Sequence, residues 1–342
     1  MPHESPNPRI AIVGASSLRG SELKQFIEDE NVPFGEISLI DTSLPAGTLA
    51  EAAGEPTFLK PMDRESFEGV RFVFFCGSTQ EAKSNWKLAA DAGATIIDLT
   101  GALEDVGAAP WIPGLDTLLA PPEATAERPH HAGMYSSPVA PVMIACRLAA
   151  ALSKFSPSRM VILFFPPASE REQLGVDELE KQTADLLLLR PIAQTVFDAQ
   201  VAFNLLSSYG EGSKPALSET RTEICKRVAA YLSGRTPAPA MQLIQAPVFY
   251  GYGFSVYVDL GGSVDVAAID AALFAAGMHV TQKGDLAPTN VSVAGEAKIH
   301  VAHAERDPDV DSGVWLWGVA DNLRLAAVNA VEIAKELLAP KI

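Results

Sequence analysis

Apolar and polar positions alternate in a regular way along the first hundred residues. Short runs rich in β-branched and aromatic residues predict buried strands at 9–15, 36–41, 70–78 and 94–101. Two segments between these runs, 20–30 and 79–93, carry apolar residues at helical spacing. Strands that alternate with helix-length segments predict βαβ units and a parallel sheet.

The pattern changes after Pro138. Longer strand-like runs are separated by Pro- and Gly-rich links, and they cover 158–165, 240–253, 254–262 and 313–319. Helical periodicity appears at 140–153, 176–189, 265–277 and 320–338. Long strands of this kind, mixed with helices, predict a second domain of α+β type with a largely antiparallel sheet.

Composition narrows the class of protein. A chain of 342 residues corresponds to about two domains of roughly 150 residues each. The net charge of −16 and the absence of a basic cluster argue against nucleic acid or an anionic membrane surface as partner. The first ten residues, MPHESPNPRI, contain no apolar run, so we expect no signal peptide. The apolar runs are shorter than the roughly 20 residues of a membrane span.

The three cysteines, Cys76, Cys146 and Cys225, form neither a CxxC pair nor an even disulfide framework. A reducing, cytoplasmic location is therefore expected.

The turn after the first strand has the outline of a dinucleotide phosphate-binding loop. Gly14 and Gly20 fill the outer glycine positions, but Ser17 stands at the middle one. Its Cβ hinders the approach of a pyrophosphate, although its hydroxyl could donate to a phosphate. A plain strand–turn–helix connection is the alternative.

Asp41 ends the second strand, where a carboxylate accepts a hydrogen bond from a ribose 2′-hydroxyl and repels a 2′-phosphate. A cofactor bound here is expected to be NAD rather than NADP. Aspartate at a strand end is also a common turn former, which is the alternative interpretation.

A second strand-to-helix junction, Ser137-Pro138-Val139-Ala140, could present a nucleophile, but its tip is alanine. Cys146 lies nearly two turns into the following helix, where a cysteine usually acts as a small apolar residue. Ser136 or Ser137 would need a base, and the adjacent histidines 130–131 are the nearest. A turn-forming role for these serines is favoured. Adjacent histidines do not readily share one tetrahedral metal, so no metal site is predicted.

Several longer stretches make the chain resemble the aspartate-semialdehyde dehydrogenase family over nearly its whole length. They are IAIVGASSLRGSEL, AADAGATIIDLTGA, IPGLD, GVDELEKQT, AFNLL, QAPVFYGY and WLWGVADNLRLAAVNAVEIAKELL. The last two are specific, and their spacing and order match. The family reduces an aspartyl phosphate to the semialdehyde with NADPH, through a cysteine thiolate and a histidine acid/base.

The resemblance implies an α/β protein of two domains. A Rossmann-type parallel-sheet domain would span 1–135 and be completed by the C-terminal helix 319–342. A mixed α+β domain for substrate binding and dimerisation would span 136–318. Weak NAD binding is expected, with NADP disfavoured, through Gly14, Ser16, Ser17, Leu18, Gly20, Asp41, Gly77 and Ser78.

At the family's chemical positions the residue types have changed. By resemblance, Ala140 lies at the nucleophile position and Tyr252 at the acid/base position. Gln245 lies where an arginine binds the substrate carboxylate, and Glu104 where an arginine binds the phosphate. The loop 43–45, where an arginine would hold a 2′-phosphate, contains none.

These changes favour a non-catalytic, homodimeric paralogue of the Usg type. One alternative is an active NAD-dependent oxidoreductase with an altered substrate and mechanism. Another is a regulatory partner that forms a heterodimer with an active family member. Substrate and biological role do not follow from the sequence.

Overall fold

The computed structural model describes residues 7–52, 55–119, 133–262 and 265–339. The chain divides into two compact units. The first unit consists of Met1–Pro113, Glu127–Val139 and Ala326–Ile342, and the second of Gly114–Ala126 and Ala140–Leu325. Histidines 130–131 lie outside the described residues.

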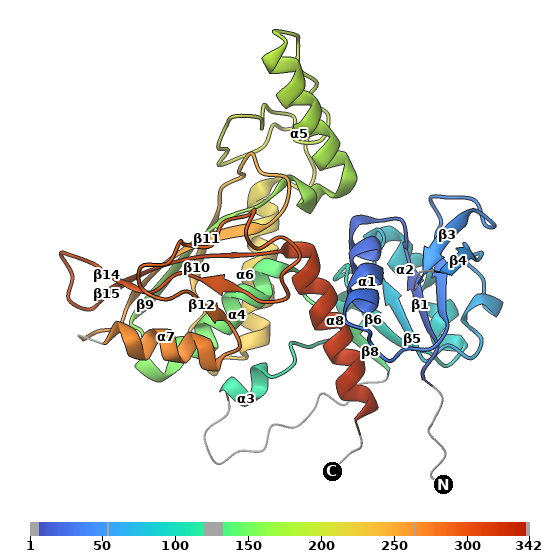
Figure 1. Ribbon diagram of the computed structural model, residues 1–342, viewed down its shortest axis with the longest axis horizontal. Helices are drawn as coiled ribbons and strands as arrows, with labels where there is room; N and C mark the ends of the chain where they lie inside the picture. The colour runs from blue at the N-terminus through green and yellow to red at the C-terminus, as the bar shows by residue number, and fades with distance from the viewer. Residues whose placement is uncertain (1–6, 53–54, 120–132, 263–264, 340–342) are drawn as a thin grey trace. The chain divides into compact units, whose positions relative to one another are not determined.

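The first unit contains a six-stranded sheet in which every pair of neighbours is parallel, in the order β2-β1-β5-β6-β8-β7. Its strands are β1 (Ile10–Val13), β2 (Ile37–Ile40), β5 (Phe72–Phe75), β6 (Thr95–Asp98), β7 (Ala109–Pro110) and β8 (Met134–Ser136). Every residue of β1 and β5 is buried, as expected for parallel strands covered on both faces. The predicted parallel-sheet domain is confirmed (Figure 1).

Helices connect these strands, and a small hairpin lies beside them. The helices are α1 (Leu18–Asp29), α2 (Thr79–Asp91) and the short η1 (Glu65–Phe67) and η2 (Glu104–Val106). The hairpin consists of β3 (Leu49–Ala52) and β4 (Glu55–Phe58). Helices α1 and α2 are each preceded by an N-cap serine, Ser17 and Ser78 respectively, whose side chain accepts a hydrogen bond from a backbone N–H of the first turn.

The second unit is built on a seven-stranded mixed sheet in the order β10-β9-β11-β15-β13-β12, with β14 also paired to β15. Its strands are β9 (Arg159–Phe165), β10 (Ala240–Leu243), β11 (Tyr252–Asp259), β12 (His279–Val280), β13 (His300–Val301), β14 (Glu305–Arg306) and β15 (Gly313–Ala320). The three long central strands β9, β11 and β15 are antiparallel to one another, whereas β10 pairs in parallel with β9, so the predicted mixed α+β sheet is confirmed.

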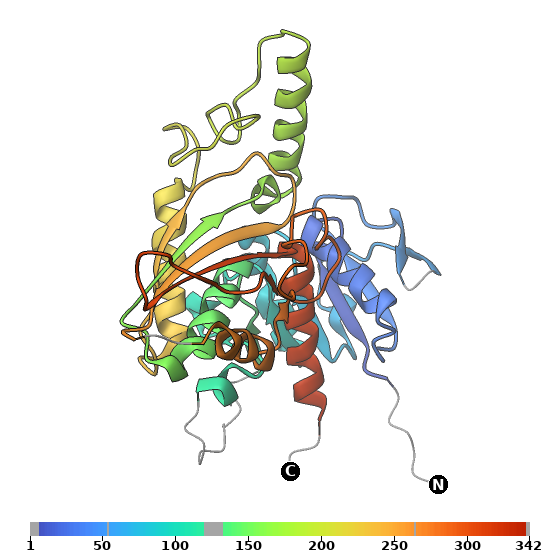
Figure 2. The ribbon, with the colours of Figure 1, turned by 60° about the vertical axis from the view of Figure 1, so that its left-hand side comes forward.

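Helices cover one face of this sheet. Helix α4 (Ala140–Leu152) contacts β9, α6 (Leu217–Leu232) and α7 (Val266–Ala275). Figure 2 shows these three helices on the same side of the sheet. The other helices of the unit are α3 (Leu115–Leu119), η3 (Ser153–Phe155), η4 (Ala168–Arg171) and α5 (Glu172–Leu187).

The C-terminal helix α8 (Asn322–Leu338) begins in the second unit, and from Ala326 it belongs to the first. In the first unit it is held by Asn329, whose side-chain amide donates to Trp111 O at 3.1 Å and to Ser137 Oγ at 2.9 Å. In the part of the chain that the structure describes, no helix is long and apolar enough to cross a membrane.

Candidate functional site

The β1–α1 turn has the tight backbone of a dinucleotide-binding loop. Gly14 has φ +75°, and a Cβ there would overlap the backbone of Gly77. A Cβ at Gly20 would overlap the carbonyl oxygen of Gly14. Both glycines are therefore required by close approach, which fits the fold of a dinucleotide site.

The hydroxyl of Ser17 is used inside the protein. Ser17 Oγ accepts from Gly20 N at 3.0 Å as the cap of α1, where Leu18 is the first residue. It also lies 2.8 Å from Gly14 O and 3.0 Å from Cys76 O. A serine hydroxyl has one proton, which is directed to a carbonyl here, so it is not free for a phosphate.

Both carboxylate oxygens of Asp41 are occupied by protein donors. Oδ2 accepts from the backbone N and hydroxyl of Ser16, at 2.8 and 2.5 Å. Oδ1 accepts from the backbone N and hydroxyl of Ser43, at 2.7 and 2.5 Å. Burial alone would raise the pKa of Asp41, but these four bonds outweigh it and lower the pKa. The group that would accept from a ribose is thus charged and already saturated.

A further carboxylate, Glu81, lies at the same end of the sheet and was not singled out from the sequence. Its Oε1 accepts from the hydroxyl of Thr42 at 2.5 Å. A Cβ at Gly77 would overlap its Oε2. In the sequence Glu81 follows Ser78 by three residues, and this spacing indicates a helix cap rather than a ligand site. The sequence signal that could have identified Glu81 is that it is an acidic residue just after the predicted strand 70–78, as Asp41 is at the end of the predicted strand 36–41.

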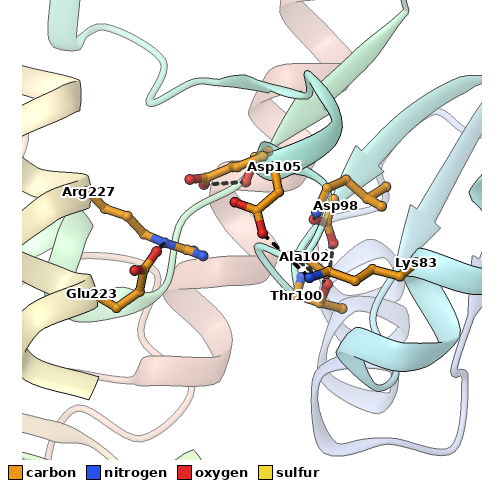
Figure 3. Close-up of polar contacts among 10 residues, drawn as sticks. Lys83, Asp98, Thr100, Ala102, Asp105, Glu223 and Arg227 are labelled. Atoms are coloured by element: carbon orange, nitrogen blue, oxygen red, sulfur yellow. Dashed lines mark hydrogen bonds and ion pairs between the residues drawn. The ribbon is translucent and has the colours of Figure 1, made fainter. Parts of the chain in front are cut away.

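Glu104 follows a strongly hydrogen-bonded turn at the end of β6 (Figure 3). Asp98 Oδ1 accepts from Thr100 N and Oγ1, at 2.8 and 2.6 Å, and Thr100 Oγ1 accepts from Ala102 N at 3.1 Å. Burial raises the pKa of the fully buried Asp98 above its ordinary value. This turn places Glu104 so that its Oε1 accepts from Ser136 Oγ at 2.8 Å.

The outer face of the same turn carries an exposed ion pair, Lys83–Asp105 at 3.5 Å. Figure 3 also shows the pair Arg227–Glu223 on α6 of the second unit, with an N–O distance of 2.9 Å. An exposed pair such as Lys83–Asp105 contributes little to stability.

Ala140 is the first residue of α4 and is 2% exposed. The strand-to-helix junction predicted here is present, because β8 ends at Ser136 and α4 begins four residues later. The nearest thiol along the chain, Cys146, is fully buried, and burial raises its pKa to about 12. It stays protonated at neutral pH and cannot act as a thiolate.

Gln245 is completely buried, and its side-chain amide is fully engaged. Nε2 donates to Pro166 O and Ala246 O, both at 2.9 Å, and Oε1 accepts from the hydroxyl of Tyr209 at 2.6 Å. The Arg171 guanidinium lies 4.9 Å from the centroid of the Tyr209 ring. The oxygen of Gln245 is bonded to Tyr209 and its NH₂ group to two carbonyls, so its amide has no capacity left for a substrate carboxylate.

Tyr252 begins β11 and is 1% exposed. Its ring packs edge-on against Phe164 with a centroid distance of 5.5 Å. Burial, followed by the charge of Glu170, raises its pKa well above the ordinary value. A buried phenol with such a pKa is a poor proton acceptor at neutral pH, so packing accounts for its position.

In the second unit, therefore, the three positions predicted for chemistry are buried: Ala140, Gln245 and Tyr252. Gln245 forms its hydrogen bonds within the core, and the ring of Tyr252 packs there. In the first unit the glycine turn keeps the shape of a nucleotide site, while its hydroxyl and carboxylate groups bond to one another. Within the described ranges, no group of three or more His, Cys, Asp or Glu residues could hold a metal ion.

Comparison with known proteins agrees with both units. Residues 9–129 match the family model "Semialdehyde dehydrogenase, NAD binding domain", and residues 168–325 match "Semialdehyde dehydrogenase, dimerisation domain". The chain is 30% identical over 333 residues to a USG-1 protein homolog of Pseudomonas aeruginosa, covering 96% of this chain and 97% of the relative. It is 25% identical to an aspartate-semialdehyde dehydrogenase of Rickettsia bellii, with coverage of 96% and 97%.

Solved structures show the same fold. The structure described as a probable aspartate-semialdehyde dehydrogenase from Pseudomonas aeruginosa aligns with a TM-score of 0.84 and 29% identity, over 97% of this chain and 98% of that one. Aspartate semialdehyde dehydrogenase II from Vibrio cholerae aligns with a TM-score of 0.83 and 21% identity, with coverage of 97% and 98%. The chain belongs to the semialdehyde dehydrogenase family and resembles its aspartate-semialdehyde dehydrogenases and USG-1 homologues.

Proposed function

We propose that this chain is a non-catalytic, homodimeric member of the family that retains a weak nucleotide site with a preference for NAD. The observation that carries the proposal is the state of Gln245, whose amide bonds entirely within the core. A group that must bind a substrate carboxylate needs free donors, and this one has none.

The predicted nucleophile position supports the same conclusion. The methyl group of Ala140 cannot form a thioester, so the covalent route is closed. Loss of a nucleophile alone costs on the order of 10⁶ in turnover in a triad enzyme. Cys146 cannot replace it, because its thiol is buried and protonated.

The proposed nucleotide site follows from the first unit. The close approach of Gly14 to Gly77 and the capped start of α1 fit a dinucleotide, whose adenosine ribose would lie at Asp41. The charged Asp41 would repel the 2′-phosphate of NADP. Because the carboxylate already accepts four bonds, a ribose must displace a serine, and binding is weak as a result.

The proposed dimer uses the sheet face of the second unit that α4, α6 and α7 leave open. Along this face lie the half-buried side chains of Val161, Leu163 and Phe165, and the more exposed Trp315 and Trp317. Apolar side chains on adjacent strands of one face form a contiguous patch, which in a member of a family with a dimerisation domain fits a second copy of the chain. The proposal assigns 1–135 with 319–342 to the nucleotide half and 136–318 to the dimerisation half.

The test is the family reaction run in reverse on the purified chain. Aspartate semialdehyde and phosphate are supplied with NAD or NADP, and formation of reduced cofactor is followed beside an active aspartate-semialdehyde dehydrogenase. We expect no rate above that of the mixture without protein. A rate within roughly 10³-fold of the active enzyme would contradict the proposal, since loss of the nucleophile alone costs far more.

A further inference from the structure

Hydrogen bonds between carboxylates and hydroxyls connect three segments at the carboxyl end of the parallel sheet. The segments are the β1–α1 turn, the residues that follow β2 and the start of α2. Asp41 ties the end of β2 to the β1–α1 turn through Ser16. Glu81 ties the residue after Asp41, Thr42, to the start of α2. These segments are the walls of a dinucleotide cleft in this fold, so the ties close its adenosine side.

Of these two carboxylates, Glu81 lies beside the glycines of the predicted phosphate-binding turn. Its Oε2 lies against Gly77, at the point where Gly77 and Gly14 approach most closely. A nucleotide pyrophosphate approaches this backbone through its glycines. The carboxyl group of Glu81 therefore stands beside the path of a negatively charged ligand group, and it is partly removed from solvent.

We propose that Glu81 weakens dinucleotide binding at this site, through its bond to Thr42 and through the negative charge that it places beside the pyrophosphate path. This inference rests on the proposed nucleotide binding and deepens it. Asp41 selects between NAD and NADP, whereas Glu81 lowers the affinity for both.

The charge on Glu81 makes this weakening depend on pH. Burial is the main reason that the pKa of Glu81 is raised, and the charge of Asp41 adds to it. Asp41 has a lowered pKa and stays ionised. Two cations are near: Arg19 donates to the carbonyls of Cys76 and Gly77, and Lys83, two residues along α2, pairs with Asp105. As the pH falls through the raised pKa of Glu81 the carboxyl becomes neutral, and affinity should rise.

Four variants separate charge from contact. Glu81→Gln keeps the shape and the acceptor for Thr42 but removes the charge, and Glu81→Ala removes both. Thr42→Val removes the bond and keeps the charge. Asp91→Asn, at the exposed far end of the same helix, is the control for a general loss of one negative charge. Calorimetry measures NAD and NADP affinity at about pH 8 and at the lowest pH at which the parent stays folded, where the raised pKa of Glu81 gives its carboxyl the largest neutral fraction.

We expect Glu81→Gln to bind NAD about tenfold more tightly than the parent at the higher pH, the size of effect that one like charge near a phosphate produces. At the lower pH the difference should shrink, and Asp91→Asn should match the parent throughout. Thr42→Val should tighten binding at both pH values.

Three results decide the matter. Equal affinity and equal pH dependence of Glu81→Gln and the parent would overturn the inference and leave the proposed function standing. Tighter binding by Glu81→Gln, but of NADP more than NAD, would support the inference and contradict the proposed cofactor preference. If Glu81→Ala is folded, as judged by an unchanged melting transition, and binds no nucleotide at all, both are wrong.

Discussion

At the scale of single residues, the positions predicted for chemistry are occupied by groups that bond to their own protein. The amide of Gln245, the carboxylate of Asp41 and the hydroxyl of Ser17 each have internal partners. Buried polar groups must be paired, because an unpaired one costs about 1–3 kcal/mol. Pairing of this kind stabilises the fold and removes the group from ligand binding.

The burial of the three cysteines predicts which of them reacts with a thiol reagent in the folded protein. Cys76 and Cys146 are fully buried, whereas Cys225 is partly exposed. Because the thiolate is the reactive form and the pKa of Cys146 is about 12, a thiol reagent near neutral pH should label Cys225 alone. Cys225→Ser should abolish labelling of the folded protein. In denaturant, all three cysteines of the parent protein should react. Rapid labelling of Cys146 in the folded variant would show an accessible thiol near Ala140.

Asp41 predicts the cofactor preference. The parent protein should bind NAD more tightly than NADP, because the ionised carboxylate repels a 2′-phosphate. Isothermal calorimetry at equal ionic strength measures the two dissociation constants. A lower constant for NADP would show that another group neutralises the phosphate.

At the scale of elements, the segment between α5 and α6 is held by two side chains of α5. Glu178 is 5% exposed, and its carboxylate accepts from Thr195 N and Oγ1, both at 2.7 Å, and from Val196 N at 2.6 Å. Gln182, one turn later, accepts from Val201 N at 2.8 Å. These bonds replace regular secondary structure as the partners of the loop backbone.

Removal of Glu178 should therefore unfold this segment first. We expect Glu178→Ala to lower the free energy of unfolding by about 2–4 kcal/mol, since several buried donors lose a charged acceptor together. The control is Glu180→Ala, an exposed glutamate on the same helix, which should change stability by less than about 0.5 kcal/mol. Urea denaturation compares them, and equal stabilities would contradict the assigned role.

The sequence predicted β1, β2, β5 and β6 of the parallel sheet, because buried strands are unbroken apolar runs with helices between them, but it did not predict the short strands β7 and β8. The predicted strand at 240–253 is not continuous: β10 ends at Leu243, and β11 begins at Tyr252. Pro247 lacks the backbone N–H that a sheet requires, and Gln245 is bonded to Leu206 and Pro166 instead. Partners from distant segments, such as Tyr209 on Gln245 or Thr42 on Glu81, cannot be read from local patterns.

At the scale of the whole molecule, the apolar sheet face of the second unit and the match to the family's dimerisation domain support the proposed homodimer. Leu163 lies near the centre of this face, opposite Ser255 on β11, and is half-buried. A charge introduced there would be desolvated in a dimer but solvated in a monomer.

Leu163→Glu should accordingly convert a dimer to a monomer at micromolar concentration, measured by multi-angle light scattering. The control is Leu49→Glu, at an exposed leucine of β3 in the first unit, which should leave the dimer intact. A monomeric parent protein would contradict the proposed homodimer, and a dimeric Leu163→Glu variant would place the interface elsewhere.

We propose that the family reaction is absent for two reasons. Ala140 replaces the nucleophile, and the residues at the substrate-binding positions, Gln245 and Glu104, cannot bind the substrate anion. The most direct measurement is turnover of semialdehyde and phosphate by the double variant Ala140→Cys/Tyr252→His, with Ala140→Cys alone as the smaller change and melting temperature as the check of folding. We predict no turnover above the parent, because Gln245 and Glu104 still cannot bind the substrate anion; restoration should require at least Gln245→Arg and Glu104→Arg. Substantial turnover by the folded double variant would contradict this claim and show a working substrate site that lacks only its two reactive groups.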